Sequence, residues 1–177
     1  EQLTLLDGNS IQLDEESLVI ADGEGPLAIA GVMGGKKSGV TEATTSVFLE
    51  CAFFSPSAIM GTGRRYGVQT DASQRYERGV DSELQNVAME RATALLVEIV
   101  GGKAGPVLEV SDGDSLPGST ELTLRSERLA HLIGERIEDE EIFGILERLE
   151  LKPRRVPEGW QISTPSHRFD ISIEEDL

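Results

Sequence analysis

The sequence predicts an α+β fold in two parts, and three features lead to this prediction. Short apolar segments separated by Asp-Gly turns open the chain, a pattern typical of antiparallel strands. A stretch with apolar residues at helical spacing follows between residues 84 and 99. Beyond an acidic, turn-rich segment, the pattern indicates a strand, two helices and a hairpin, which make a second and smaller α+β part.

Length and charge limit the classes of partner. The chain has 177 residues, enough for one large or two modest domains with a buried core. Its 32 acidic residues outnumber the 16 lysines and arginines, so the formal net charge is −16. This charge opposes non-specific attraction to nucleic acid or to an anionic membrane, and any RNA contact must therefore be local.

The cysteine content predicts a reducing compartment, the cytoplasm. Cys51 is the only cysteine, so no internal disulfide can form, and no Cys or His group has zinc-ligand spacing. No segment resembles a signal peptide, and no apolar run approaches the ~18 residues that span a bilayer. We interpret both ends as cuts inside a longer polypeptide.

The opening segment predicts strands at residues 3–6, 11–13, 17–22 and 26–33. The apolar run SVFLECAFF (46–54) is long enough for one buried strand and carries the charged Glu50 at its centre. Ser55-Pro56 is a helix-start signal, residues 59–67 predict a short helix interrupted by glycines, and Asp71 opens another helix.

The strongest helix signal begins after Asp81 or Ser82, either of which can cap it, and stops at Gly101-Gly102. Residues 107–110 are a candidate for one further strand. The turn-forming, acidic segment that follows is typical of a linker. We therefore divide the chain into domains at residues 1–116 and 117–177.

In the second part, residues 121–125 predict a strand and residues 126–134 a short helix closed by Gly134. Residues 151–165 predict a β-hairpin wing. The helix near residues 138–150 is acidic and would repel phosphate, so DNA binding is not expected. Four of its residues are expected to face inward: Ile142, Ile145, Leu146 and Leu149.

Three strings occur in order: GVMGG at 31–35, LECAFFSP at 49–56 and TGRRYGVQTDASQRYERGVD at 62–81. Together they resemble the editing domain of the bacterial phenylalanyl-tRNA synthetase beta subunit. The segment from about residue 120 to the end resembles the small winged-helix-like domain that follows it in that family. The resemblance covers essentially the whole chain. It implies a mixed-sheet editing portion with packed helices, then a winged-helix-like α+β domain.

The resemblance also implies partners. The family synthesises Phe-tRNA as a heterotetramer of two alpha and two beta subunits, and its beta subunit hydrolyses misacylated Tyr-tRNA. tRNA(Phe) and the alpha subunit are therefore expected partners, with ligation belonging to the alpha subunit. The family's editing pocket includes residues that would precede residue 1, so the isolated chain is expected to have little activity. The alternative is a non-catalytic structural or interaction module of the synthetase.

Glu50 is the residue whose role depends most on the resemblance. A carboxylate in an apolar strand is expensive to desolvate unless it is paired, so the residues alone favour a buried ion pair with Arg64, Arg65 or Arg75. The resemblance instead implies an editing pocket in which Glu50 accepts the hydrogen bond of a tyrosine hydroxyl. Such a site can reject the analogue without that hydroxyl by on the order of 10⁴-fold.

The resemblance places three further residues in this pocket: Gly34, Thr70 and Ala72. Glycine permits close approach to the main chain, and free N–H groups at a helix start can orient water or a carbonyl. Without the resemblance, GVMGG would be a tight turn or bulge, and Thr70 a helix cap. No nucleophile can be assigned, because Cys51 is in an apolar strand and both histidines lie in the second domain. Bound water is the expected nucleophile, activated by positioning, with the terminal ribose hydroxyl of the tRNA as a candidate assistant.

Two charged groups complete the candidate residues. Four arginines form a basic island to which phosphates of a tRNA acceptor end could dock, the alternative being internal salt bridges. These are Arg64, Arg65, Arg75 and Arg78. Near the end of the chain, acidic residues offer the oxygen ligands that Mg²⁺ prefers, although most acidic runs are solvated. The resemblance makes Asp170 and Asp176 candidate ligands of a Mg²⁺ shared with the alpha subunit, the other acids lying beyond residue 177.

Overall fold

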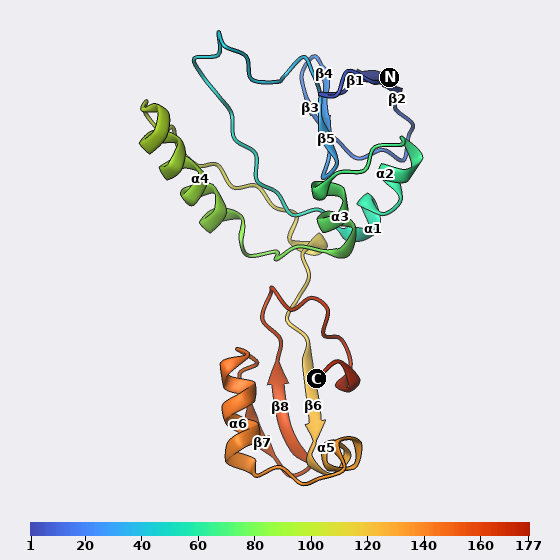
Figure 1. Ribbon diagram of the computed structural model, residues 1–177, viewed down its shortest axis with the longest axis vertical. Coiled ribbons are helices and arrows are strands. Elements are labelled where there is room, and N and C mark those ends of the chain that lie inside the picture. The colour runs from blue at the N-terminus through green and yellow to red at the C-terminus, as the bar shows by residue number, and fades with distance from the viewer. The chain divides into compact units, whose positions relative to one another are not determined.

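The computed structural model describes the backbone of residues 1–177 and every side chain except that of residue 114. The chain divides into two compact units (Figure 1). Unit 1 comprises Glu1–Val80 and Leu84–Ser115, and unit 2 comprises Asp81–Glu83 and Leu116–Leu177. Both units combine helices with antiparallel sheets, so the predicted α+β class is confirmed.

Unit 1 begins with two small antiparallel sheets. The first is the hairpin of β1 (Gln2–Thr4) and β2 (Ser10–Gln12), and the second has the order β3-β4-β5. Its strands are β3 (Val19–Asp22), β4 (Gly25–Ile29) and β5 (Met33–Gly34). A bridge between Leu5 and Gly35 connects the two sheets. The predicted opening strands are confirmed, except that the apolar run 26–33 turns back on itself after Ile29.

Short helices pack against these sheets. They are α1 (Pro56–Ile59), α2 (Thr62–Arg65) and α3 (Asp71–Arg78). The core joins residues from both sheets to residues from the helical region, with Phe54, Tyr66 and Tyr76 packed at its edge. Its buried members are Leu3, Leu5, Ile29, Ala30, Val32, Ile59 and Val68. This core fixes α3 against the β4–β5 turn.

Two predicted strands are wrong. Residues 46–54 and 107–110 have no strand conformation, and residues 41–54 form a long loop outside the β3–β4–β5 sheet (Figure 1). A β-rich apolar run becomes a strand only when a neighbouring strand accepts its backbone hydrogen bonds. The carbonyl of Ala52 is bonded instead by a side chain, the Tyr76 hydroxyl. Phe48 is 89% exposed, so the run is not buried as expected.

The long predicted helix is confirmed as α4 (Gln85–Val100), which ends at Gly101 with a φ of +74°. The expected capping residues are wrong, because Leu84 occupies the N-cap position and the Asp81 carboxylate accepts the N–H of Glu83. None of the residues of α4 is buried. Among the described residues, no helix has the length and apolar character needed to cross a membrane.

Unit 2 is a three-stranded antiparallel sheet with two helices. In chain order its elements are β6 (Glu121–Arg125), α5 (Ser126–Ile133), α6 (Asp139–Arg148), β7 (Arg154–Val156) and β8 (Gly159–Ser163). The sheet order is β6-β8-β7, so the predicted hairpin is confirmed. Single 3₁₀ turns lie at Gly113–Ser115 in unit 1 and at Glu174–Asp176 in unit 2.

The core of unit 2 lies between this sheet and α6. Ile142 and Leu146 are buried as predicted, whereas Ile145 and Leu149 remain 37% and 46% exposed. The other buried members are Leu124, Leu151, Trp160, Ile162 and Ile171. Helix α6 therefore buries a narrower stripe than its apolar pattern indicated.

Candidate functional site

Thr70 caps α3 and also ties it to the sheet. Its Oγ1 accepts the N–H of Ser73 at 3.0 Å, and the Ser73 hydroxyl accepts the N–H of Thr70 at 3.0 Å, which makes a capping box. The Thr70 hydroxyl also donates to the carbonyl of Val32 at 2.8 Å. The helix-cap interpretation of Thr70 is therefore confirmed, and the same side chain holds the start of α3 beside the β4–β5 turn.

The GVMGG segment forms that turn and β5. Gly31 has a φ of +66°, which glycine adopts without strain. A Cβ on Gly35 would lie 2.5 Å from the Leu27 carbonyl oxygen, so the fold itself requires glycine there. A Cβ on Gly34 would lie 3.2 Å from Cδ1 of Leu6, a flexible and 57% exposed side chain. The Leu6 side chain could therefore move aside to make room for a group bound beside Gly34.

Glu50 lies in the 46–54 loop and is exposed, not buried within a strand as predicted. Enough protein surrounds its carboxyl to raise the pKa of Glu50 through desolvation. Among the described side chains Glu50 has no ion-pair partner. The alternative in which an arginine neutralises it is therefore not realised in the structure.

Tyr76 is a residue that the sequence interpretation missed. Its hydroxyl donates to the Ala52 carbonyl at 3.1 Å, and its ring packs on Phe54 with centroids 5.4 Å apart. Desolvation raises the pKa of Tyr76, and the nearby charges of Glu50 and Cys51 raise it further. The only signal in the sequence is one aromatic residue in the otherwise polar helix DASQRYER.

Two hydrogen bonds connect the segments that carry the predicted pocket residues. Thr70 is joined directly to Val32, two residues before Gly34. The loop of Glu50 is joined to α3 through Tyr76. Ala72 is half-buried and lies one helical turn before Tyr76, where residues four apart are neighbours on one face.

The thiol of Cys51 is not an activated nucleophile. Burial raises the pKa of Cys51, and the adjacent Glu50 charge raises it further, so the thiol stays protonated near neutral pH. Both histidines, His131 and His167, lie in unit 2. Among the described side chains of unit 1, Glu50 is therefore available as a hydrogen-bond acceptor, but no nucleophile is paired with a catalytic base.

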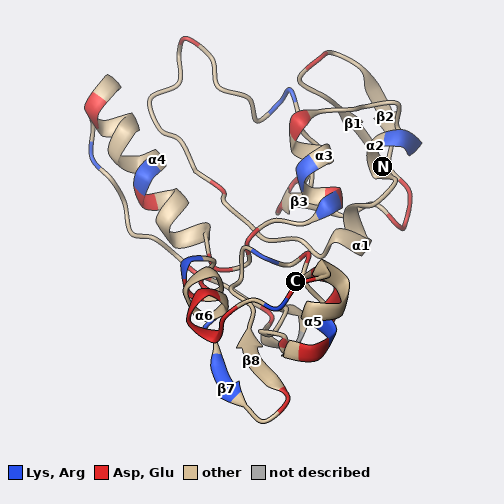
Figure 2. Cartoon of the chain, turned by 60° about the horizontal axis from the view of Figure 1, so that its bottom comes forward, with Lys and Arg blue, Asp and Glu red and all other residues tan. Residues whose placement is uncertain are grey.

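The basic island divides into one paired and three unpaired arginines. Arg65 forms ion pairs with Asp14 at 3.0 Å and with Glu16 at 3.1 Å. Arg64, Arg75 and Arg78 are exposed and have no ion pair with the described side chains. Figure 2 shows basic residues on both α2 and α3. The salt-bridge alternative therefore applies to Arg65 alone.

The two candidate magnesium ligands are both engaged by protein groups. Arg168 donates to both carboxylate oxygens of Asp170 at 2.9 Å, and this lowers the pKa of Asp170. Asp176 Oδ2 accepts the N–H groups of Ser172 and Ile173 at 2.8 and 3.0 Å. Within the described residues no three acidic, His or Cys side chains are placed to hold a metal ion. These two carboxylates alone do not fit a magnesium site, which takes about six ligands.

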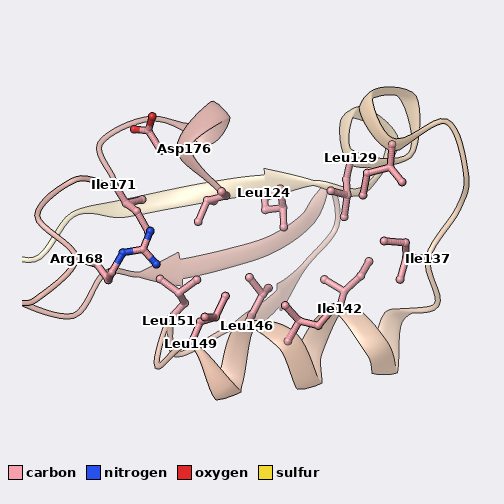
Figure 3. Close-up of a pocket in the computed structure, with 13 residues that line it drawn as sticks. Leu124, Leu129, Ile137, Ile142, Leu146, Leu149, Leu151, Arg168, Ile171 and Asp176 are labelled. Atoms are coloured by element: carbon pink, nitrogen blue, oxygen red, sulfur yellow. The ribbon is translucent and has the colours of Figure 1, made fainter.

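Unit 2 contains an apolar groove of about 300 Å³ between α5, α6 and the end of the chain (Figure 3). Its lining includes Leu124 and Leu129 on one side, Ile142 of α6 on the other, and the charged Arg168 and Asp176. The partly exposed Ile145 and Leu149 line this groove together with the buried Ile142 and Leu146.

Comparison with known proteins gives two family matches. Residues 1–101 match the B3/4 domain, and residues 122–177 match the tRNA synthetase B5 domain. Among curated proteins, the chain is 56% identical to the phenylalanine–tRNA ligase beta subunits of Pseudoalteromonas translucida and Idiomarina loihiensis, and 53% identical to that of Nitrosococcus oceani. Each similarity covers 100% of this chain and 22% of the relative. The chain thus spans about a fifth of the length of these relatives.

Proposed function

The chain belongs to the B3/4 domain family and is similar over its whole length to phenylalanine–tRNA ligase beta subunits, and we propose that its unit 1 contributes to hydrolysis of misacylated Tyr-tRNA(Phe). The observation that carries the proposal is the state of Glu50. It is a carboxylate without an ion-pair partner among the described side chains, in surroundings that raise its pKa. Such a group is an available acceptor for a phenol hydroxyl.

Selectivity in this proposal comes from one hydrogen bond. A bound tyrosine donates its hydroxyl to Glu50, whereas a bound phenylalanine leaves the carboxylate without that donor. The substrate and the complete pocket shield this carboxylate from water in the proposal, so bound phenylalanine leaves the acceptor desolvated without a partner and is rejected by on the order of 10⁴-fold. Gly34 and Ala72 leave space for the substrate, and Thr70 fixes the helix start beside it.

Hydrolysis proceeds through a bound water in this account. Since the Cys51 thiol stays protonated, no covalent intermediate with the chain is invoked. The free N–H groups at the start of α3 orient the ester carbonyl, and the terminal ribose hydroxyl of the tRNA assists the water. Other residues of the complete beta subunit finish the pocket.

The exposed Arg64, Arg75 and Arg78 bind phosphates of the tRNA acceptor end in this proposal. Their charges are not neutralised by described carboxylates, so phosphate contact replaces no internal ion pair. Arg65 contributes to the fold, because Asp14 and Glu16 already bind it.

Unit 2 serves as structural support in the enzyme. The first turn of α6 carries Asp139, Glu140 and Glu141, so this helix would repel phosphate. We assign residues 1–116 to the editing domain and residues 117–177 to the winged-helix-like domain of an enzyme of two alpha and two beta subunits in the cytoplasm. A Mg²⁺ ion at Asp170 and Asp176 would need ligands from elsewhere in the enzyme and displacement of Arg168.

The test is hydrolysis by the complete ligase carrying Glu50→Ala in its beta subunit. Tyr-tRNA(Phe) hydrolysis should fall strongly relative to Phe-tRNA(Phe) hydrolysis, while aminoacylation with phenylalanine is retained. Glu42→Ala is the matched control, since it removes an exposed carboxylate from the same loop region. Unchanged selectivity in the Glu50 variant would refute the proposal.

A further inference from the structure

Tyr76 lies where three segments of unit 1 meet. On one side its hydroxyl bonds the Ala52 carbonyl at 3.1 Å, and its ring contacts Phe54. On another side the ring lies under the β4–β5 turn, since a Cβ built on Gly31 would be 3.1 Å from Cγ of Tyr76. Within α3, Tyr76 is four residues after Ala72. The same side chain therefore touches the loop, the turn and the helix that carry the predicted pocket residues.

The loop carrying Glu50 lacks the usual means of fixing a backbone. Residues 46–54 have no strand pairing, so ladder hydrogen bonds do not set the position of Glu50. Val47 and Phe48 are 48% and 89% exposed and provide little packing. Two residues after Glu50, the hydroxyl of Tyr76 holds the backbone directly.

We propose that Tyr76 is the positioning residue of the editing site, setting the place of the Glu50 carboxylate by bonding the Ala52 carbonyl while its ring is held between Gly31 and Phe54. The inference rests on the proposed function of Glu50. Tyr76 does not touch the substrate in this arrangement. It acts through Glu50, so its effect should disappear when Glu50 is absent.

The magnitude follows from the loss of one hydrogen bond and of precise placement. Loss of one intramolecular hydrogen bond changes an equilibrium constant by roughly tenfold. Displacement of a reacting group by about 1 Å can lower a rate by roughly 100-fold. Removing only the hydroxyl of Tyr76 leaves the ring between Gly31 and Phe54. We therefore expect the selectivity for Tyr-tRNA(Phe) over Phe-tRNA(Phe) to fall about tenfold in Tyr76→Phe.

The first experiment measures this selectivity ratio in the complete ligase with Tyr76→Phe. A ratio is used because loss of folded enzyme lowers both rates equally and leaves the ratio unchanged. Tyr66→Phe is the matched control, since the Tyr66 hydroxyl binds Ser17 and the N–H of Asp14 instead of the loop. The control should keep the wild-type ratio. A Tyr76→Phe enzyme with the wild-type ratio overturns the inference.

A second pair of variants perturbs the ring instead of the hydroxyl. Gly31→Ala places a methyl group 3.1 to 3.3 Å from three Tyr76 atoms, at a φ of +66°. Gly67→Ala introduces the same backbone strain at a φ of +67° but meets no atom within 4 Å. The ratio should fall in Gly31→Ala and stay unchanged in Gly67→Ala. Equal ratios in the two variants would contradict positioning by Tyr76.

Glu50→Ala separates this inference from the function on which it rests. If Tyr76 acts through Glu50, the double variant Glu50→Ala with Tyr76→Phe should match Glu50→Ala alone. An additional tenfold loss in the double variant would overturn the positioning role. If Glu50→Ala leaves the ratio unchanged, the proposed function fails first, and the inference falls with it. If only Tyr76→Phe is neutral, the proposed function stands and the inference alone is wrong.

Discussion

The hydroxyl of Thr70 donates a 2.8 Å hydrogen bond to the carbonyl of Val32, a residue 38 positions earlier in the chain. The same oxygen accepts the N–H of Ser73 as the cap of α3. One side chain thus stabilises a local helix start and a long-range contact. Removing its hydroxyl should affect both.

Thr70→Val should lower the free energy of unfolding of unit 1 by about 1–3 kcal/mol, because the cap and a part-buried hydrogen bond are removed together. Thr70→Ser keeps the hydroxyl and should retain most of the stability. Hydrogen exchange at the α3 amides measures the effect. Unaltered protection in Thr70→Val would contradict the role assigned to this hydroxyl.

Replacing Arg64, Arg75 and Arg78 with alanine should weaken tRNA(Phe) binding by the complete ligase and reduce its salt dependence. Each tRNA phosphate that is no longer bound should lower the slope of log K against log salt by roughly 0.7–1. Binding titrations at several salt concentrations provide the measurement. Arg65→Ala is the control, and removal of its two exposed ion pairs should leave the slope unchanged.

Glu174 should make unit 2 sensitive to acid. Hydrogen bonds from the Arg125 side chain, followed by its backbone N–H, hold the pKa of Glu174 below its usual value of 4.5. A lowered pKa stabilises the fold fully above about pH 4.5, and this contribution is lost as the pH falls through the lowered value. Glu174→Gln should therefore reduce the loss of stability on acidification.

Trp160 gives the readout for this test, because it is the only tryptophan and lies buried in unit 2. Denaturant unfolding followed by its fluorescence at several pH values compares Glu174→Gln with wild type. Glu147→Gln removes one exposed carboxylate of α6 and serves as the control. An identical acid dependence in wild type and Glu174→Gln would exclude a contribution from the Arg125 contact.

Gly159→Ala should destabilise unit 2 far more than Gly134→Ala. A Cβ at Gly159 would lie 2.1 Å from the Leu124 carbonyl oxygen and 2.8 Å from the Ser126 nitrogen, so β6 and β8 would have to separate. A Cβ at Gly134 meets nothing within 4 Å, and its φ of +85° alone costs about 1–2 kcal/mol. Trp160 fluorescence in denaturant measures both variants. Similar unfolding midpoints would show that β8 can move away from β6.

The features predicted from the sequence are those fixed by local chemistry. Thr70 and Ser73 have the spacing of a cap, Gly101 and Gly134 end helices, and the 151–165 pattern specifies a hairpin. In each case the residues that interact lie close together in the sequence.

The errors concern features that depend on distant partners. Residues 46–54 have the composition of a strand, yet their conformation depends on whether a strand edge is available. Tyr76 was missed because its partner Ala52 lies 24 positions away, and nothing in the two strings that contain these residues shows that they contact each other. The arginines also depend on distant partners. Asp14 and Glu16 lie about 50 positions before Arg65, and the sequence does not show that they bind Arg65 and not Arg64.

The sheet order of unit 2 has a consequence during protein synthesis. Strand β6 pairs with β8, where Leu122 lies opposite Ile162, and β7 pairs only with β8. The ribosome therefore releases β6, α5 and α6 before the sheet of unit 2 can form, and at about 5–20 residues per second this interval lasts seconds. Throughout it the apolar side of α6 has no sheet to cover it. Until Gly159–Ser163 has been made, the apolar residues Ile142 and Leu146 of α6 therefore cannot pack on β8.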